Sequence, residues 1–254
     1  MDACRTTCNV DNLYSCNYFF SHRSLLFKTL ISISMMMKSE IKKVEILDLE
    51  LMEYSECLNE MYKIRDQRKI GKGKDTLILV EHYPVATLGR RGEMNEIIDD
   101  KLAVYEIERG GKSTYHAPGQ IVLYPVMHMG EGNRDVRGWV RHLEGFVIDL
   151  LGDFGIKTSV KPDLPGVWVD KSDKKIASIG ISIEGWVSFH GISINVTIDP
   201  NEFNRINPCG LGAEVMTNMF QEGSDCSIKD IKKWIKLNVN KIHPSRAVPA
   251  PNRL

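Results

Sequence analysis

The sequence predicts an α+β domain in which helices pack on the faces of a mixed or antiparallel sheet. Short apolar strand patterns cluster between amphipathic helical patterns, and they do not alternate with helices as regularly as in a parallel α/β protein. The chain has 254 residues, of which 43% are hydrophobic and 26% are charged. That composition is typical of a globular protein with one large domain.

The first half of the chain predicts one helix among several strands. The sequence VEILDL, from Val44, is typical of a short strand. Leu51–Ile70 carries apolar residues close to helical spacing, and Gly71 and Gly73 end the pattern. We expect further strands at Thr76–Glu81, Val104–Glu108 and Ile121–Val126, and a loop from Pro84 to Gly92.

The second half predicts two further amphipathic helices with strands between them. Val136–Phe154 has apolar residues at helical spacing, and Gly155 follows as a usual helix-ending residue. Ser227–Asn240 shows the same periodicity. Between these helices we expect short strands at Gly166–Val169, Lys175–Ile183, Val187–Phe189 and Ile192–Ile198.

The two ends of the chain differ from this pattern. Residues 1–34 carry Cys4, Cys8 and Cys16, are rich in Ser and Thr, and show little periodicity. We interpret them as a non-globular extension, either read from an upstream start or serving as a weak targeting peptide, and we expect them to be dispensable. Residues 35–243 then form a single domain, and residues 244–254 form a loose tail.

Charge and cysteine spacing exclude several classes of function. Lys+Arg and Asp+Glu number 33 each, so the net charge is zero and no global basic field for nucleic acid exists. No run of apolar residues is long enough to span a membrane. The six cysteines contain no CxxC pair, so we expect reduced thiols and no metal site.

The segment Arg109–Gln120, RGGKSTYHAPGQ, is the first candidate functional segment. Its paired glycines let the backbone approach a ligand closely or adopt positive φ. Arg, Ser, Thr, Tyr and His beside them are unusual in a purely structural turn. A hairpin loop with polar side chains is the alternative. The segment matches neither the P-loop nor the GxGxxG pattern.

A cysteine and a lysine are the candidate catalytic residues. Cys209 lies between Pro and Gly, and a turn there would project its sulfur outward as a nucleophile. A lone cysteine is also commonly an inert buried side chain. The reactive form is the thiolate, so a cation must lower the thiol pKa. Lys175, His116 and His190 are available, although a lysine at a strand end is also typical of a solvated edge.

Three ordered blocks of the sequence resemble the lipoyl(octanoyl) transferase family. RGGKSTYHAPGQIVLYPV resembles the family's RGG-x-x-TYH-G-PGQ loop, and KKIASIGISI its K-I-x-S-x-G strand. SFHGISINVTIDPNEFNRINPCG resembles its HG-x-x-x-N-V segment and NPCG turn. The blocks lie within Val44–Asn240, and LGRRG resembles an early loop of the family. Ala117 stands where the family usually has Gly, and residues 1–34 have no counterpart.

The resemblance implies the fold of lipoate and biotin protein ligases and assigns roles to individual residues. Cys209 matches the nucleophile that carries the acyl group as a thioester, and Lys175 matches the lysine that lowers its pKa. The segments that match substrate-binding positions are Arg109, Gly110, Gly111, Lys112, Ser113, Thr114, Tyr115 and His116, then Ser178, Ile179 and Gly180, and finally Gly191, Ile192 and Ser193.

The implied reaction is the first step of endogenous protein lipoylation. Octanoyl passes from an acyl carrier protein to a specific lysine of a lipoyl domain, in 2-oxoacid dehydrogenase complexes or in the glycine cleavage H protein. A thioester donor needs no ATP, so no cofactor is expected. Arg90, Arg91, Arg109 and Lys112 are then expected to form a local basic surface for an acidic carrier.

Two other functions stay open from the sequence. One is an ATP-dependent lipoate–protein ligase of the same fold, against which the NPCG turn argues. The other is a non-catalytic protein that binds acyl groups or lipoyl domains. We expect a monomer in the cytoplasm, or in an organellar matrix if residues 1–34 are a transit peptide.

Overall fold

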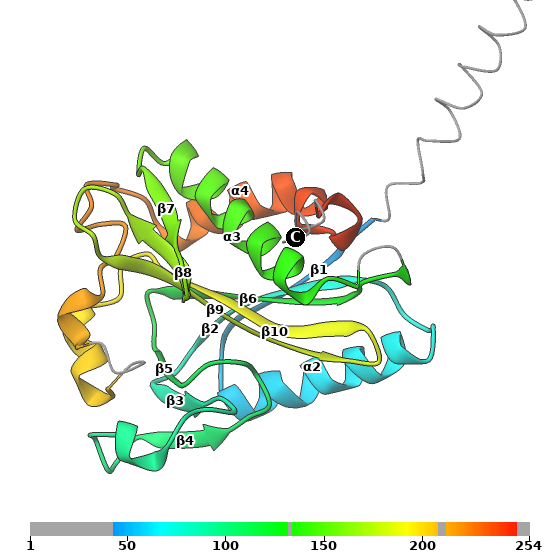
Figure 1. Ribbon diagram of the computed structural model, residues 1–254, viewed down its shortest axis with the longest axis horizontal. Helices are drawn as coiled ribbons and strands as arrows, with labels where there is room; N and C mark the ends of the chain where they lie inside the picture. Colours follow the sequence, from blue (N-terminus) through cyan, green and yellow to red (C-terminus); the bar gives the residue numbers. More distant parts are fainter. Residues whose placement is uncertain (1–42, 132–133, 208–211, 248–254) are drawn as a thin grey trace, which may run out of the picture. The chain divides into compact units, whose positions relative to one another are not determined.

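The computed structural model describes residues 43–131, 134–207 and 212–247. Within these residues a seven-stranded sheet forms the centre of the molecule, with the strand order β1-β2-β6-β10-β9-β8-β7 (Figure 1). Its strands are β1 (Glu45–Met52), β2 (Thr76–His82), β6 (Gln120–His128), β7 (Thr158–Lys161), β8 (Leu164–Val169), β9 (Lys175–Glu184) and β10 (Val187–Asn195). Only β1 and β2 pair in parallel in this sheet, and the other described neighbours are antiparallel.

A smaller three-stranded sheet, in the order β4-β3-β5, accompanies the main sheet in the described residues. It contains β3 (Val85–Leu88), β4 (Ala103–Glu106) and β5 (Ser113–His116). β3 pairs in parallel with β4 and antiparallel with β5. Both sheets are therefore mixed, which confirms the predicted fold class.

Helices cover both faces of the main sheet (Figure 1). α2 (Tyr54–Lys69) packs on one face, and α3 (Val136–Asp153) and α4 (Ile228–Asn238) pack on the other. Because side chains alternate along a strand, Leu77 of β2 joins the core under α3, whereas Ile78 joins the core under α2. This two-sided burial explains why the sequence LILV, Leu77–Val80, is continuously apolar. Short 3₁₀ turns occur at Met94–Glu96, Pro200–Arg205, Ala213–Val215, Val239–Ile242 and Pro244–Arg246.

The edge strand β1 is held by the C-terminal helix. The Nζ of Lys232 in α4 lies 2.6 Å from Oδ1 of Asp48 and 2.9 Å from Oε2 of Glu50. Beyond α4, the side-chain oxygen of Asn240 accepts a hydrogen bond from the backbone N–H of Val44 at 3.4 Å. The two ends of the described domain therefore lie against each other.

The sequence prediction is wrong about the region after Phe189. Two strands were expected, Val187–Phe189 and Ile192–Ile198, but β10 is continuous from Val187 to Asn195. Gly191 lies within this strand. A Cβ at residue 191 would lie 2.2 Å from the carbonyl oxygen of Leu123 in β6, so a larger residue does not fit there. The glycine permits close approach of two paired backbones instead of ending a strand.

Three short strands were not predicted. β3 lies where a loop was expected after Pro84, β5 lies inside the Arg109–Gln120 segment, and β7 follows α3. Each has four residues, which is too short to show a periodic pattern. Their pairing with neighbouring strands, and not their local sequence, makes them strands.

The two ends of the chain lie largely outside the described residues. Residues 1–34 do so entirely, so the predicted extension stays a prediction. The expected loose tail is wrong for Pro244–Arg246, which form a 3₁₀ turn in which Pro244 is buried. Just before it, the His243 side chain bonds to Asp75 at 3.1 Å. None of the described helices is both long and apolar enough for a membrane span.

Candidate active site

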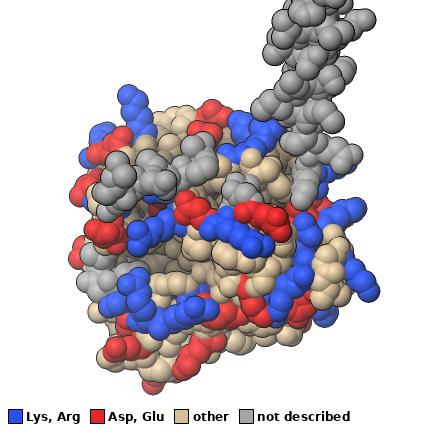
Figure 2. Space-filling model, turned by 45° about the vertical axis from the view of Figure 1, so that its right-hand side comes forward, with Lys and Arg blue, Asp and Glu red and all other residues tan. Residues whose placement is uncertain are grey.

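A cavity of about 470 Å³ is formed by residues of both sheets and of α3. Figure 2 shows a hollowed face of the molecule with Lys and Arg side chains along its edges. Arg91 and Lys112 line the cavity. Inside it, polar groups of the Arg109 segment face β9 and β10, and Ile107, Val122 and Tyr54 contribute apolar surface.

The structure brings nearly all described candidate residues to this one cavity. They are Arg109, Gly110, Gly111, Lys112, Ser113, Thr114, His116, Lys175, Ser178, Ile179, Gly180, Gly191, Ile192 and Ser193. Cys209 lies outside the described residues. Three segments that are distant in sequence therefore meet at a single concave surface, as expected for a binding site.

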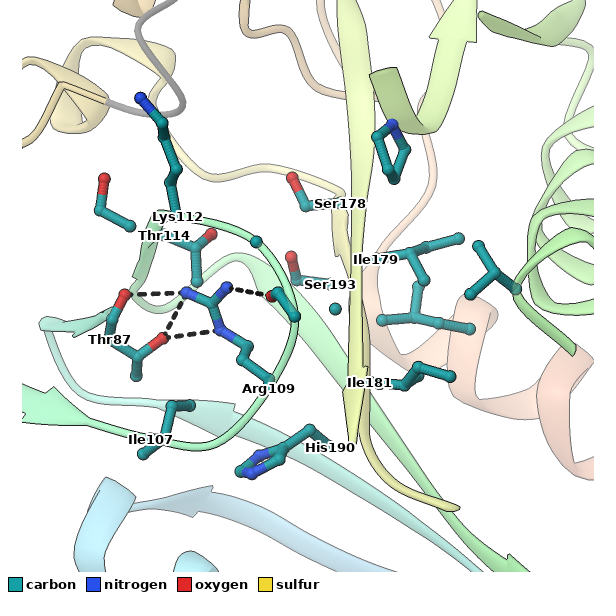
Figure 3. Close-up of a pocket in the computed structure, with 18 of the residues that line it drawn as sticks. Thr87, Ile107, Arg109, Lys112, Thr114, Ser178, Ile179, Ile181, His190 and Ser193 are labelled. Carbon is teal, nitrogen blue, oxygen red and sulfur yellow. Dashed lines mark hydrogen bonds between the residues drawn. The ribbon is translucent and has the colours of Figure 1, made fainter. Parts of the chain in front are cut away.

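Strand pairing explains how β9 and β10 contribute to the cavity. Ser178 pairs with Ser193, and Gly180 pairs with Gly191. In Figure 3, Ser178 and Ser193 point toward the Arg109 segment, whereas Ile179 points to the other side of the sheet. A Cβ on Gly180 would lie 3.1 Å from both Arg109 Cδ and the Gly110 carbonyl oxygen. The absence of a side chain thus lets the Arg109 segment pack directly on β9.

Arg109 is buried, and its guanidinium is held by Thr87 of β3 (Figure 3). Nη2 donates to the Thr87 carbonyl oxygen at 2.8 Å, and Nη2 and Nε donate to Oγ1 at 3.0 and 3.2 Å. Nη1 donates to the Gly110 carbonyl oxygen at 3.0 Å. The expectation that Arg109 belongs to an exposed basic surface is therefore wrong. Arg90 and Arg91 are exposed, and Lys112 is half-exposed.

Lys175, the first residue of β9, lies in the wall of the cavity with 8% exposure. Its burial excludes the solvated-edge interpretation that the sequence left open. Its Nζ lies 5.7 Å from the centre of the Trp168 ring. The neighbouring Lys174 is half-buried and does not line the cavity.

The histidines near the cavity are neutral at pH 7. Burial, with a smaller contribution from His82, lowers the pKa of His116 to about 3, and burial lowers the pKa of His82 to about 4. His116 Nδ1 lies 2.6 Å from Gln120 Oε1. Burial also lowers the pKa of His190, although Glu108 opposes this effect at 3.5 Å. None of the three is a cation suited to lowering a thiol pKa.

Tyr115 is the described candidate residue that does not line the cavity. It alternates with Thr114 and His116 along β5, so its ring points to the opposite face and packs near Phe203. Its hydroxyl donates to Glu202 at 2.7 Å and lies 3.0 Å from Arg205 Nη1. The predicted binding role of Tyr115 is corrected to a structural one. Ala117 is also buried in this apolar cluster.

Both described flanks of residues 208–211 are attached to the site. The backbone N–H of Asn207 donates to the Glu96 carbonyl oxygen at 2.7 Å, and Ser113 Oγ donates to the Asn207 carbonyl oxygen at 3.3 Å. On the other side, the Thr217 N–H donates to the Lys175 carbonyl oxygen at 3.0 Å. Described residues on both sides of Cys209 therefore contact Ser113 and Lys175.

Sequence reasoning missed several residues of this site. Thr87, Tyr54 and Ile107 line the cavity but belong to no motif. Glu96 is buried, and its Oε2 accepts the backbone N–H of Ser113 at 2.8 Å. No local signal in the sequence indicates these contacts, since each joins segments that come together only in the folded chain.

Comparison with known proteins identifies the family. Residues 53–239 match the model of the lipoyl protein ligase A/B catalytic domain. An octanoyltransferase of Syntrophotalea carbinolica is 40% identical over 190 residues, which cover 74% of this chain and 89% of that protein. An octanoyltransferase of Thermoanaerobacter sp. (strain X514) is 38% identical over 200 residues, which cover 76% and 87%.

Solved structures show the same fold at low sequence identity. Lipoate-protein ligase A bound with ATP superposes with a TM-score of 0.61 at 14% identity, over 79% of this chain and 85% of that one. A bipartite lipoate protein ligase from Thermoplasma acidophilum gives a TM-score of 0.57 at 13% identity, over 79% and 83%. By fold and by sequence, the chain belongs to the lipoyl protein ligase A/B catalytic domain family and, within it, to the octanoyltransferases.

Proposed function

We propose that this acyltransferase moves octanoyl from an acyl carrier protein to a lysine of a lipoyl domain through a thioester on Cys209. The observation that carries the proposal is the cavity in which buried Lys175, the Arg109 segment and the paired glycines of β9 and β10 meet. The attachment of Asn207 and Thr217 to this cavity wall supports a role for the intervening cysteine.

The chemistry proceeds in two steps that share one intermediate. The Cys209 thiolate attacks the donor's thioester carbonyl, forms a new C–S bond and expels the carrier's thiolate. The ε-amine of the acceptor lysine then attacks the acyl-enzyme, forms the amide, loses a proton and expels the Cys209 thiolate. The thioester carbonyl is already activated, so neither step needs ATP. Backbone N–H groups of the glycine-rich segments are suited to stabilise the oxyanion.

Lys175 supplies the charge that favours the thiolate. An ordinary cysteine has a pKa of about 8.5, so only a small fraction is thiolate at neutral pH. A nearby ammonium lowers that pKa. Lys175 is the buried lysine in the described cavity wall, and the neutral histidines do not supply a competing cation.

The apolar part of the cavity is suited to a medium-length acyl chain. Ile107, Val122 and Tyr54 lie on the same side of the sheet as the Arg109 segment, and His190 is neutral beside them. In Figure 3, Ile107 and His190 lie on the opposite side of Arg109 from Lys112. We therefore place the thioester toward Lys112 and the end of the chain toward Ile107.

The proposed partners follow from this reaction. The donor is an octanoyl-acyl carrier protein, which meets the exposed cations Arg90 and Arg91 and the half-exposed Lys112. The acceptors are lipoyl domains of 2-oxoacid dehydrogenase complexes or the glycine cleavage H protein. We further propose that the enzyme acts as a monomer in the cytoplasm.

Mass spectrometry of the intact protein tests the proposed intermediate. After mixing with octanoyl-acyl carrier protein, the wild type should gain one octanoyl group that hydroxylamine removes and that maps to Cys209. Cys209→Ser should gain none, whereas Cys226→Ser, at a half-buried cysteine away from the cavity, should behave like the wild type. If no adduct forms but lipoate is transferred in an ATP-dependent reaction, the protein is a ligase. If neither the adduct nor the ATP-dependent transfer is observed, it is a binding protein.

The pH dependence of thiol alkylation tests the role of Lys175. In Lys175→Ala the rate profile of Cys209 should move to higher pH, since the thiolate loses its neighbouring charge. Lys175→Arg should rescue the profile only in part, because the guanidinium has a different shape. Superimposable profiles of the wild type and Lys175→Ala would show that Lys175 does not set the thiol pKa.

A further inference from the structure

One carboxylate of α3 is buried on the helix face that packs against the sheet. Glu144 has an exposure of 6%, and its neighbours on this face include Leu143 and Val147. Burial raises the pKa of Glu144, as expected for a carboxyl group taken out of water. Buried carboxylates require compensating partners, so the partners of Glu144 indicate its role.

The partners of Glu144 lie at the strand next to Lys175. Its Oε1 accepts a hydrogen bond from the backbone N–H of Gly166 in β8 at 3.1 Å. The positive charges of Arg141 and Lys175 also act on the carboxylate and oppose the effect of burial. Glu144 itself does not line the cavity. It therefore lies behind the cavity wall, where it can act on the lysine but not on substrate.

Gly166 provides the surface on which the Lys175 side chain lies. Its φ is +124°, a backbone conformation that residues with a side chain rarely adopt. A Cβ at this position would lie 2.5 Å from Lys175 Cε and 3.2 Å from Nζ. The same Cβ would lie 2.5 Å from the Ala177 carbonyl oxygen. Any side chain at residue 166 would thus displace the lysine.

The pairing of β8 with β9 is irregular at this place. Val167 pairs with Ala177, but the next residue, Trp168, pairs with Lys175, so the register shifts between them. A bulge of this kind redirects a side chain and is frequent beside active sites. The direction of Lys175 therefore depends on the backbone of residues 166–168, and Glu144 binds the first of these.

We propose that Glu144 is a positioning residue for Lys175. Its carboxylate accepts the hydrogen bond of the Gly166 N–H and so fixes the bulged backbone on which the Lys175 side chain lies. Its negative charge also favours the charged ammonium form of Lys175 at the cavity wall. This inference rests on the proposed function of Lys175 in activating Cys209.

The test measures single-turnover formation of the octanoyl thioester for Glu144 variants in two backgrounds, wild type and Lys175→Ala. In the wild-type background Glu144→Leu should slow the step roughly 10- to 100-fold, since small misplacements of reacting groups cost up to about 100-fold. In the Lys175→Ala background the same substitution should change the rate little, because the residue through which it acts is gone. Glu144→Gln retains an acceptor for Gly166 and should fall between.

The matched control is Asp149→Asn, which removes a carboxylate from an exposed position on the same helix and should leave both rates unchanged. Equal slowing by Glu144→Leu in both backgrounds, or no slowing in either, would overturn the inference. If the leucine variant does not fold, Glu144→Gln makes the same comparison. An absent thioester on the wild type would reject the proposed function and this inference with it, whereas an active wild type with additive effects would reject the inference alone.

Discussion

The guanidinium of Arg109 is fixed by Thr87, whose carbonyl and hydroxyl oxygens both accept its hydrogen bonds. This contact joins the small sheet to the wall of the candidate active-site cavity. Thr87→Val keeps the shape of the side chain but removes the hydroxyl acceptor. We expect the free energy of unfolding to fall by about 1.5–3 kcal/mol, the usual value for a hydrogen bond to a charged group. Denaturant titration measures it.

Activity provides the second readout for the same residue. A less constrained Arg109 should raise KM for the octanoyl donor in Thr87→Val. Thr87→Ser keeps the hydroxyl and serves as the control, with near wild-type KM and stability. The interpretation fails if valine and serine at residue 87 give the same KM.

Tyr115→Phe separates the structural role of Tyr115 from a binding role. The substitution removes the hydroxyl that bonds to Glu202 and lies beside Arg205. We expect a loss of about 1 kcal/mol in unfolding free energy and unchanged kcat/KM, since the ring faces away from the cavity. Thr114→Val, one residue earlier and lining the cavity, should instead lower kcat/KM. A large loss of activity in Tyr115→Phe would contradict the corrected role.

Ile107→Ala should lengthen the acyl chain that the enzyme accepts. The substitution removes apolar volume at the end of the cavity away from Lys112. One methylene in an apolar pocket is worth about 1–3 kcal/mol, so the ratio of decanoyl to octanoyl transfer should rise about tenfold or more. Ile78→Ala, buried under α2 away from the cavity, controls for lost stability. An unchanged ratio would place the end of the acyl chain elsewhere.

Arg91→Glu tests the exposed cations at the edge of the cavity. We expect KM for octanoyl-acyl carrier protein to rise at low salt, and the difference from wild type to shrink at 1 M salt, where the Debye length is about 3 Å. Lys72→Glu makes the same charge change at an exposed position that does not line the cavity, and it should have little effect. Equal salt dependence in the two variants would argue against a carrier site at Arg91.

Asp75 should make the fold sensitive to acid. Burial raises the pKa of its carboxyl group, but hydrogen bonds from His243, Arg68 and the His128 N–H outweigh burial and hold the pKa below its ordinary value. The stabilisation is therefore present at neutral pH and is lost as the pH falls below about 4.

The Asp75→Asn variant measures this contribution. At pH 7 it should lose about 3 kcal/mol of unfolding free energy, as for a broken buried ion pair. The difference from wild type should narrow as the pH falls. Asp66→Asn, at an exposed carboxylate beside Arg65, should show a smaller difference. If the unfolding free energies of Asp75→Asn and wild type differ by a constant amount from pH 7 to pH 3, Asp75 is not the acid-sensitive group.

The sequence predicts those parts of the fold in which many residues of one element are buried together and so form an apolar pattern. β2 follows from a continuous apolar run, because both of its faces are buried, and α3 follows from apolar periodicity, because burial of one helix face constrains every third to fourth residue. β3 and β5 do not, since four residues each carry too little pattern and their partners are distant in the chain.

The residues of the candidate site divide in the same way, into those that a local motif reveals and those that it does not. The glycines and polar residues of Arg109–His116 form one continuous segment, so a motif can reveal them. Thr87, Glu96 and Glu144 accept hydrogen bonds from residues that lie 17 to 22 positions away in the sequence, and nothing beside them in the sequence marks those contacts. Tyr115 lies within the motif but faces away from the cavity, because side chains alternate along a strand. The sequence of this short strand does not show which of its two faces points to the cavity.

The contact of α4 with β1 has a consequence for synthesis on the ribosome. Lys232 follows Glu50 by 182 residues, so at about 5–20 residues per second the nascent β1 waits roughly 10 to 40 s for its ammonium partner. Throughout that time the carboxylates of Asp48 and Glu50 lack this positive charge. A polypeptide released before α4 is complete would lack both Lys232 and Lys236, which pair with Asp48, and truncated products of this enzyme should therefore hold β1 less firmly on the sheet.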